Sequence, residues 1–369
     1  MKPTVIVGGG IVGVSLAYQL AGTGTPVTLF EKNSLGSGTT AASIAQFIRY
    51  QESPNRAEHE RRERSWEWYE PLIDSGEFEF DPIGTLHTAS SKADMAHLRE
   101  LQATYGEFGF ASELVGPAEL TDYGLDPDRF AGGLLVPEDG VLDPNEILQY
   151  MASEARECGA EIETGVAVTD VLVENGAVAG VETTDGITDA AVVINAAGPW
   201  AHEIDEMVGV STPLRHTEGP IVVLQANRSH PVPLTFFEDE VYVRQEGGSD
   251  LLAGRFARGY EDSTRFDPDH ARPIEESFYL TVGDVVDRYF PTLSDVRILN
   301  EWNGLRTVTP DGMPIVDETA VDGYLLAVGM SGYGVTTAPA IGELCGEWLQ
   351  TGTKPDLLES LALDRFDFR

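Results

Sequence analysis

Apolar and polar positions follow the same order at both ends of the chain. Near the start, a β-branched run over 4–7 is followed by glycines, a helical apolar pattern over 11–20 and a second apolar run over 26–31. Near the end, a strand pattern over 324–328, a glycine-rich turn and a helix pattern over 336–349 repeat that order. Strands that alternate with helices in this way predict parallel strands joined by helices, as in a βαβ unit.

The middle of the chain contains further elements of both kinds. The charged segment over 57–72 carries three large aromatic residues and predicts an amphipathic helix at a domain junction. Asp143 and Pro144 fit the N-cap and first position of a helix that ends near Cys158. Strands are expected at 161–163, 166–174, 177–183, 191–196, 221–224, 241–244 and 251–253, the last three in an antiparallel sheet.

The sequence is strongly acidic. Its 369 residues include 24 lysines and arginines against 61 aspartates and glutamates, for a formal net charge of −37. A surface this negative repels phosphate groups and anionic lipids, so we expect no nucleic-acid partner. Because the acidic residues are spread along the chain, we expect no metal site. We interpret the excess as adaptation to a salt-rich, halophilic cytoplasm, where a Debye length of about 3 Å at ~1 M salt screens the repulsion.

Two further features bear on the compartment. Cys158 and Cys345 are too few for a disulfide framework, which favours a reducing environment. Glycines interrupt the apolar stretch over 4–21, and no later run reaches the ~20 apolar residues of a membrane span. We therefore expect a cytoplasmic protein with no membrane span.

The first turn between strand and helix carries a dinucleotide-binding fingerprint. Gly8, Gly10 and Gly13 follow the spacing G-x-G-x-x-G, and Glu31 closes the second strand. The three glycines allow a tight turn, close approach of backbone to a pyrophosphate, and close packing of helix on strand. The helix N-terminus attracts the phosphates, and Glu31 can accept hydrogen bonds from ribose hydroxyls. This pattern predicts dinucleotide binding.

Two later segments favour FAD over a nicotinamide cofactor. Residues 36–43 are small or carry hydroxyls and offer a second backbone cradle, which a nicotinamide enzyme does not need. Residues 193–200 form a strand that ends in a turn of small residues, against which a cofactor can lie.

Together these stretches resemble the FAD-dependent amino-acid and amine oxidoreductase family, which includes D-amino-acid oxidases and dehydrogenases, glycine oxidase and sarcosine oxidase. The matching segments cover nearly the whole chain: VIVGGGIVGVSLAYQLA with FEK, GSGTTAAS, PEDGVLDPNEIL, VINAAGPWA, VYVR, GLRTVTPDGMPIV and VGMSGYGVTTAPAIGEL. The resemblance implies an α/β fold, with a Rossmann-like FAD-binding domain and an interleaved α+β substrate domain built on an antiparallel sheet. We assign residues 1–80, 146–210 and 303–369 to the FAD-binding domain and residues 81–145 and 211–302 to the substrate domain.

The resemblance also implies which residues bind the cofactor. It places Val168 at the adenine, the residues from Thr39 to Ala42 along the pyrophosphate, and the last six residues of the following list at the isoalloxazine ring. The residues expected to bind FAD are Gly8, Gly10, Ile11, Val12, Gly13, Glu31, Lys32, Ser37, Gly38, Thr39, Thr40, Ala42, Val168, Ala197, Gly198, Gly304, Arg306, Gly332, Tyr333, Gly334 and Val335. Monomeric sarcosine oxidases of the family anchor the flavin through a cysteine at the position of Gly304, so we expect non-covalent FAD.

Physical reasoning on the final segment also favours a redox role. If the turn over 332–334 brings the N-terminus of the last helix against the flavin, the helix dipole stabilises the anionic reduced ring.

Arg306, on an expected strand before the Pro310 turn, carries a planar guanidinium suited to a substrate carboxylate, as in family members that oxidise glycine and D-amino acids. Tyr242 matches a tyrosine that relatives place over the active site. Arg49 and His216 are weaker candidates, since such single residues usually form structural hydrogen bonds.

The expected function is FAD-dependent oxidation of a small amino acid or N-methyl amino acid by hydride transfer to flavin N5, which gives an imine that hydrolyses. Sarcosine oxidases use a lysine near the flavin to activate oxygen, and no lysine lies between Lys92 and Lys354. This absence slightly favours a dehydrogenase, with oxygen, a quinone or an electron-transfer protein as acceptor. The alternatives are an FAD-dependent 2-hydroxy-acid dehydrogenase and a non-catalytic flavin-binding assembly subunit.

Overall fold

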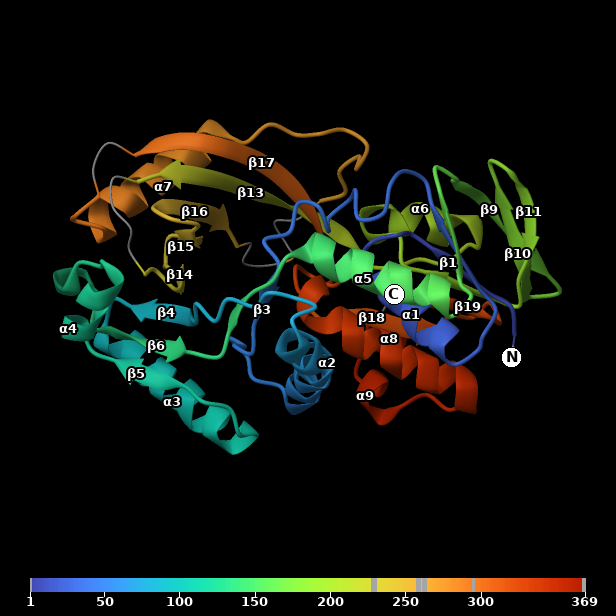
Figure 1. Ribbon diagram of the computed structural model, residues 1–369, viewed down its shortest axis with the longest axis horizontal. Coiled ribbons are helices and arrows are strands. Elements are labelled where there is room, and N and C mark those ends of the chain that lie inside the picture. Colours follow the sequence, from blue (N-terminus) through green and yellow to red (C-terminus); the bar gives the residue numbers. More distant parts are fainter. Residues whose placement is uncertain (1, 227–230, 257–259, 261–263, 294–295, 367–369) are drawn as a thin grey trace.

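The chain folds into two lobes, each built around one large sheet (Figure 1). The structure is a computed structural model, and it describes residues 2–226, 231–256, 260, 264–293 and 296–366. Both ends of the chain belong to the lobe that contains the six-stranded sheet, which lies on the right in Figure 1. The chain crosses between the lobes several times, so the lobes are interleaved.

The six-stranded sheet forms the Rossmann-like lobe. Its order is β18 (Ile315–Glu318), β19 (Tyr324–Val328), β12 (Val192–Asn195), β1 (Thr4–Val7), β2 (Val27–Glu31) and β8 (Glu161–Thr164), and only β18 runs antiparallel to its neighbour. One face is covered by α1 (Ile11–Gly22), α2 (Arg56–Ser75), α5 (Pro144–Glu157), α8 (Gly334–Thr351) and α9 (Asp356–Glu359). The other face is covered by α6 (Ala201–Met207) and a three-stranded sheet of β9 (Val168–Glu174), β10 (Ala177–Thr183) and β11 (Gly186–Asp189).

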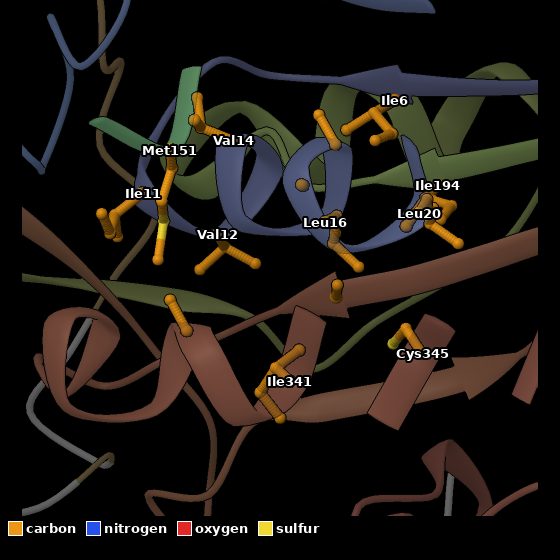
Figure 2. Packing of buried hydrophobic residues seen from close by; sticks show 14 of the residues in the cluster. Ile6, Ile11, Val12, Val14, Leu16, Leu20, Met151, Ile194, Ile341 and Cys345 are labelled. Atoms are coloured by element: carbon orange, nitrogen blue, oxygen red, sulfur yellow. The ribbon is translucent and has the colours of Figure 1, made fainter. Parts of the chain in front are cut away.

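Helices α1 and α8 pack closely on each other. Figure 2 shows Val12 and Leu16 of α1 pointing toward α8, which carries Ile341 and Cys345. The close approach requires a small residue, because a Cβ on Gly342 would stand 2.8 Å from the Ser15 carbonyl oxygen. This contact holds α1 and α8 side by side. The N-terminal turns of both helices therefore reach the same region of the lobe.

The eight-stranded sheet forms the second lobe. Its order is β17 (Arg297–Val308), β13 (Arg215–Gln225), β16 (Asp250–Arg255), β15 (Val241–Glu246), β14 (Leu234–Phe236), β4 (Thr85–Ala89), β6 (Gly132–Val136) and β5 (Glu113–Val115). The sheet is antiparallel except where β14 pairs with β4 in parallel, so the expected antiparallel sheet is a mixed one. Helices α7 (Glu276–Tyr289), α4 (Pro117–Leu120) and α3 (Lys92–Phe108) pack on this lobe, and β3 (Gln46–Phe47) pairs with β7 (Gly140–Val141) between the lobes.

The structure confirms most of the elements that the sequence pattern predicts. Asp143 caps α5 by accepting hydrogen bonds from the backbone of Asn145 and Glu146. The helix expected over 57–72 is α2, which continues through Pro71 to Ser75. Strand β17 continues past residue 303, where we place a domain boundary, and pairs with β13 as far as Val308. The division of the chain by residue number remains a proposal. Within the described ranges, no helix is long and apolar enough to cross a bilayer.

Candidate active site

A deep cavity opens where the carboxyl ends of β1, β12 and β19 meet the N-termini of α1 and α8. Its volume is about 1300 Å³, counted out to its open mouth. Most of the residues predicted to bind FAD line this cavity: Gly8, Gly10, Ile11, Val12, Glu31, Lys32, Ser37, Gly38, Thr39, Thr40, Val168, Ala197, Gly198, Gly332, Gly334 and Val335. Segments that are far apart in the sequence thus form one site.

Two helix N-termini at this cavity lack a cap from their own N-cap residue, although the Ile11 amide of α1 donates to the Thr40 hydroxyl at 3.1 Å. Neither Gly10, the N-cap of α1, nor Tyr333, the N-cap of α8, caps its helix through a side chain. The first turn of each helix also lacks an acidic residue, in a chain with 61 of them. The remaining amide groups of these first turns and a positive helix end suit an anionic partner, so these two helix ends fit the pyrophosphate and the electron-rich ring of FAD.

The glycines of the fingerprint are required by close backbone contacts. A Cβ on Gly13 would stand 1.9 Å from the Gly8 carbonyl oxygen, and a Cβ on Gly8 would stand 2.6 Å from the Ala196 carbonyl oxygen. Gly13 does not line the cavity. It lets α1 pack against the turn at Gly8, which does line the cavity. Gly8 also has a φ of 108°, which side-chain-bearing residues rarely adopt.

Glu31 is fixed at the end of β2 by two backbone amides. Its Oε2 accepts a hydrogen bond from the Gly9 amide and its Oε1 accepts one from the Asn33 amide, both at 2.8 Å. A carboxylate has about four acceptor positions, so each oxygen keeps one free for a hydroxyl group in the cavity. This arrangement fits a ribose, as the sequence predicts.

The other predicted FAD-binding residues lie next to the lining. A Cβ on Gly304 would stand 2.7 Å from the Cβ of Ala42, so these two residues contact each other. The Thr39 hydroxyl donates to the Leu305 carbonyl at 2.7 Å, and the Trp302 indole donates to the Ala42 carbonyl at 3.1 Å. These contacts hold β17 against the cavity wall and leave no room at Gly304 for a side chain that could anchor a flavin.

Arg306 and Tyr242 come together on the face of the eight-stranded sheet beside the cavity. Arg306 follows Leu305 on β17, next to the cavity-lining Thr307, and its Nη2 donates to the Arg255 carbonyl. Tyr242, on β15, is 5% exposed; burial raises the pKa of its hydroxyl, which the charge of Arg306 partly offsets. In the described part of the chain, Arg306 forms no ion pair with a carboxylate, so its charge is available to a ligand.

Two glycines that the sequence analysis did not single out make room for this pair. A Cβ on Gly219 would stand 3.1 Å from Nη2 of Arg306, and a Cβ on Gly254 would stand 2.3 Å from the hydroxyl of Tyr242. Both glycines lie in strand interiors, where glycine usually marks the close approach of another group. The strands predicted at 221–224 and 251–253 stop short of both glycines, so only the structure shows that they lie inside strands.

A row of aromatic side chains also escaped the sequence analysis. The ring of His87 stacks between Tyr50 and Phe236, with centroid distances of 3.3 and 4.6 Å. Phe236 also lies 5.7 Å from Tyr242 and 5.2 Å from Phe256. No local pattern could have revealed this row, because its members come from β4, β14, β15 and two loops.

The two weaker candidates have structural roles. The Arg49 side chain is buried, and its Nε donates to Glu63 Oε1 at 2.8 Å. Both ring nitrogens of His216 are hydrogen-bonded, Nε2 with the Pro199 carbonyl at 3.0 Å and Nδ1 with the Phe266 backbone at 3.1 Å. Burial also lowers the pKa of His216.

The mouth of the cavity carries a contact between the lobes, which we call the Lys32 clasp: Lys32, Trp200 and Asp269. Lys32 Nζ lies 2.6 Å from Asp269 Oδ1 and 4.2 Å from the centroid of Trp200. The Trp200 indole donates to the same carboxylate oxygen at 3.1 Å. Lys32 and Trp200 line the cavity, whereas Asp269 comes from the segment between β16 and α7.

A Rossmann-like sheet with this fingerprint, a long cavity at its strand ends and a second sheet beside it defines a dinucleotide-binding oxidoreductase fold. The family described as FAD dependent oxidoreductase matches residues 4–348. The chain belongs to this family, which confirms the resemblance read from the motifs and FAD as the cofactor.

Similar proteins include both long and short relatives. The chain is 30% identical over 382 residues to human mitochondrial dimethylglycine dehydrogenase, which covers 96% of this chain and 43% of that protein. It therefore spans less than half of that relative. It is 29% identical to sarcosine oxidase subunit beta of Rhizobium meliloti (strain 1021), over 98% of this chain and 88% of that one. The crystal structure of L-proline dehydrogenase from P. horikoshii has a TM-score of 0.88 at 28% identity and covers 99% of this chain and 97% of that one.

Proposed function

We propose that this chain binds FAD without a covalent bond and oxidises the C–N bond of a small amino acid or N-methyl amino acid. The observation that carries this proposal is the position of Arg306, an arginine without an ion pair among the described residues, beside an FAD-sized cavity. The names of the similar proteins support the substrate class, since they include dimethylglycine, sarcosine and L-proline dehydrogenases.

Arg306 and Tyr242 would bind the substrate carboxylate. A guanidinium presents parallel N–H donors to two carboxylate oxygens, and the Arg255 carbonyl already restrains one of its nitrogens. The raised pKa of Tyr242 keeps its hydroxyl protonated and able to donate. Binding the carboxylate at this edge of the cavity orients the rest of the substrate, and orientation supplies much of the rate enhancement. FAD, when bound, supplies the hydride acceptor that no side chain can replace.

Anaerobic reduction of the flavin tests the proposal. The yellow protein is mixed, without oxygen, with sarcosine, dimethylglycine, L-proline and glycine, and in parallel with the hydroxy acids glycolate and lactate. Bleaching of the flavin absorbance by an amine supports the proposal. Bleaching by hydroxy acids alone would instead indicate a 2-hydroxy-acid dehydrogenase, and no bleaching by any compound would indicate an assembly subunit.

We propose that the electron acceptor is a quinone or an electron-transfer protein rather than oxygen, on the basis of the missing lysine between Lys92 and Lys354. Reoxidation of the bleached protein by air and by a soluble quinone distinguishes these acceptors. Rapid reoxidation by air would indicate an oxidase.

We also propose that the protein works in the cytoplasm of a cell with concentrated internal salt. The net charge of −37 supports this setting, because the charges repel one another unless ions screen them. Thermal unfolding in dilute buffer and in concentrated KCl tests it. We expect a higher melting temperature in KCl, and equal values would contradict the proposal.

A further inference from the structure

Arg61 and Arg62 are adjacent, buried arginines on α2 that share one carboxylate. Arg61 Nη2 donates to Glu58 Oε2 and Arg62 Nε donates to Glu58 Oε1, both at 2.9 Å. The two arginines are 0% and 4% exposed. A buried guanidinium is costly unless its charge and its N–H groups find partners, and one carboxylate serves two of them here. The other contacts of each arginine therefore reveal what each one supports.

The two side chains leave α2 toward different parts of the molecule. Arg61 Nη1 donates to the Leu357 carbonyl at 2.7 Å and to the Ser360 hydroxyl at 3.1 Å, so it holds the C-terminal segment. Arg62 Nη1 donates to the carbonyls of Ile48 and Tyr50, each at 2.8 Å. The guanidinium carbon of Arg62 also lies 4.7 Å from the centroid of the Tyr333 ring.

Both segments that Arg62 contacts connect to the pair of Arg306 and Tyr242, one through the aromatic row and the other through Gly332. Tyr50 contributes its ring to the aromatic row through His87. Tyr333 is the N-cap of α8 and follows Gly332, where a Cβ would stand 3.4 Å from Cδ of Arg306. Tyr333 is 38% exposed, so it is open to a ligand while Arg62 lies against its ring.

The residues around Arg62 are themselves held by further hydrogen bonds. Glu58 is fixed by the other arginine, and its backbone amide donates to Asn55 Oδ1 at the N-cap of α2. On the same helix, the Tyr69 hydroxyl donates to the Val335 carbonyl at 2.8 Å, in the first turn of α8. Helix α2 thus holds the beginning of α8 at two places, at the Tyr333 ring and at the Val335 backbone.

We propose that Arg62 is a positioning residue for substrate binding, which fixes Tyr50 and Tyr333 near Arg306 and Tyr242, in the region that we call the substrate chamber. Arg62 does not itself contact the substrate. The cation–π contact sets the orientation of Tyr333, and the two carbonyl contacts set the course of the chain at Tyr50. This inference rests on the proposed function, because it assigns the chamber to a carboxylate-bearing amine.

The test compares Arg62→Met with Arg61→Met. Both variants remove a buried guanidinium from Glu58, so both should lose stability. We expect Arg62→Met to raise KM about tenfold with a smaller change in kcat, and to weaken binding of methoxyacetate, a carboxylate that cannot be oxidised at a C–N bond, by a similar factor. Methoxyacetate binding is followed by the change in flavin absorbance. Arg61→Met should leave KM and methoxyacetate binding within about twofold of the wild type. Equal effects of the two variants would overturn the inference.

Substitutions at Tyr333 keep the inference testable if Arg62→Met does not fold. Tyr333→Phe keeps the ring and should bind methoxyacetate nearly as the wild type does, whereas Tyr333→Leu should bind it about tenfold more weakly. Arg62→Lys keeps the charge but cannot reach Glu58 and both carbonyls together, so its affinity for methoxyacetate should fall between those of wild type and Arg62→Met.

Combining Arg62→Lys with Tyr333→Leu should add little to the effect of Tyr333→Leu alone, and strictly additive effects would contradict the link. A wild-type protein that binds methoxyacetate but is reduced by no amine would contradict the proposed function. In that case, methoxyacetate binding by the variants would still show whether Arg62 and Tyr333 are coupled.

Discussion

The two halves of the proposed active site differ in the groups that form them. The FAD cavity is formed mainly by backbone and small residues, and its tightest contacts are between carbonyl oxygens and glycines such as Gly8 and Gly13. The proposed substrate side is formed by long side chains, including Arg306 and Tyr242, which contact residues on other strands. We expect that adding a single carbon damages the first half and that changing a single guanidinium damages the second.

The largest effect should come from the side chain that is expected to contact the substrate. Arg306→Lys keeps the charge but loses the planar pair of donors, so we expect kcat/KM to fall by about 2 to 4 kcal/mol of transition-state binding. Steady-state kinetics with an accepted amine measures the loss. Arg297→Lys, at the exposed end of the same strand, is the control and should be unchanged. An Arg306→Lys enzyme with normal kcat/KM would remove Arg306 from the site.

On the cofactor side, one added methyl group should be nearly as harmful. In Gly13→Ala the new Cβ would stand 1.9 Å from the Gly8 carbonyl oxygen, so α1 must move away from the turn that faces the pyrophosphate. We expect FAD binding to weaken by about 3 kcal/mol, measured as flavin retained after desalting and by titration with FAD. Gly22→Ala, at the other end of α1, has no atom within 4 Å of the new Cβ and should bind FAD normally. Retention of FAD by Gly13→Ala would contradict this account of the fingerprint.

A third prediction concerns Asp139, a buried carboxyl group whose protonation affects the stability of the fold. Asp139 is fully buried, its Oδ1 accepts a hydrogen bond from the Arg49 amide at 2.7 Å, and burial raises its pKa to about 6. The native state therefore holds this proton more tightly than the unfolded state does. The contribution of Asp139 to stability falls as the pH rises from about 4 to about 6 and stays low above that range.

Asp139→Asn cannot titrate, so it should gain stability relative to the wild type over that range, on the order of 2 kcal/mol. Denaturant unfolding of both proteins at about pH 4.5 and about pH 7.5, in concentrated KCl, measures this difference. A difference between the two proteins that does not vary with pH would show that Asp139 keeps an ordinary pKa.

The smallest effect should come from the Lys32 clasp, where the two halves meet at the mouth of the cavity. Asp269→Asn removes an ion pair whose partners are 32% and 54% exposed, and exposed pairs contribute little. We expect FAD to dissociate about two- to fivefold faster, read from the rise of free FAD fluorescence after dilution. Asp287→Asn on α7 makes the same charge change away from the cavity and should release FAD at the wild-type rate. Equal rates for all three proteins would mean that the clasp does not retain FAD.

The difference between the cofactor side and the substrate side also explains which parts of the site could be predicted from the sequence. The glycines, Glu31 and the small residues after it were predictable because a phosphate cradle is a local structure, formed by residues close together in the chain. Arg306 and Tyr242 were identified through the family resemblance, and the structure places them on strands β17 and β15 of one sheet. The aromatic row of Tyr50, His87 and Phe236 was not predicted, because its members have no common spacing.

The sequence by itself determined the alternation of strands and helices, the dinucleotide fingerprint and the acidic surface, because each depends on residue type and local spacing. Only the tertiary structure decided that Arg61 holds the C-terminal segment while Arg62 reaches Tyr333, although the two arginines are neighbours in the chain. The same holds for the parallel pairing of β14 with β4 inside an otherwise antiparallel sheet. The physical reason is that direction and partner of a buried side chain or strand depend on what the rest of the chain packs against it, and that packing leaves no trace in local spacing.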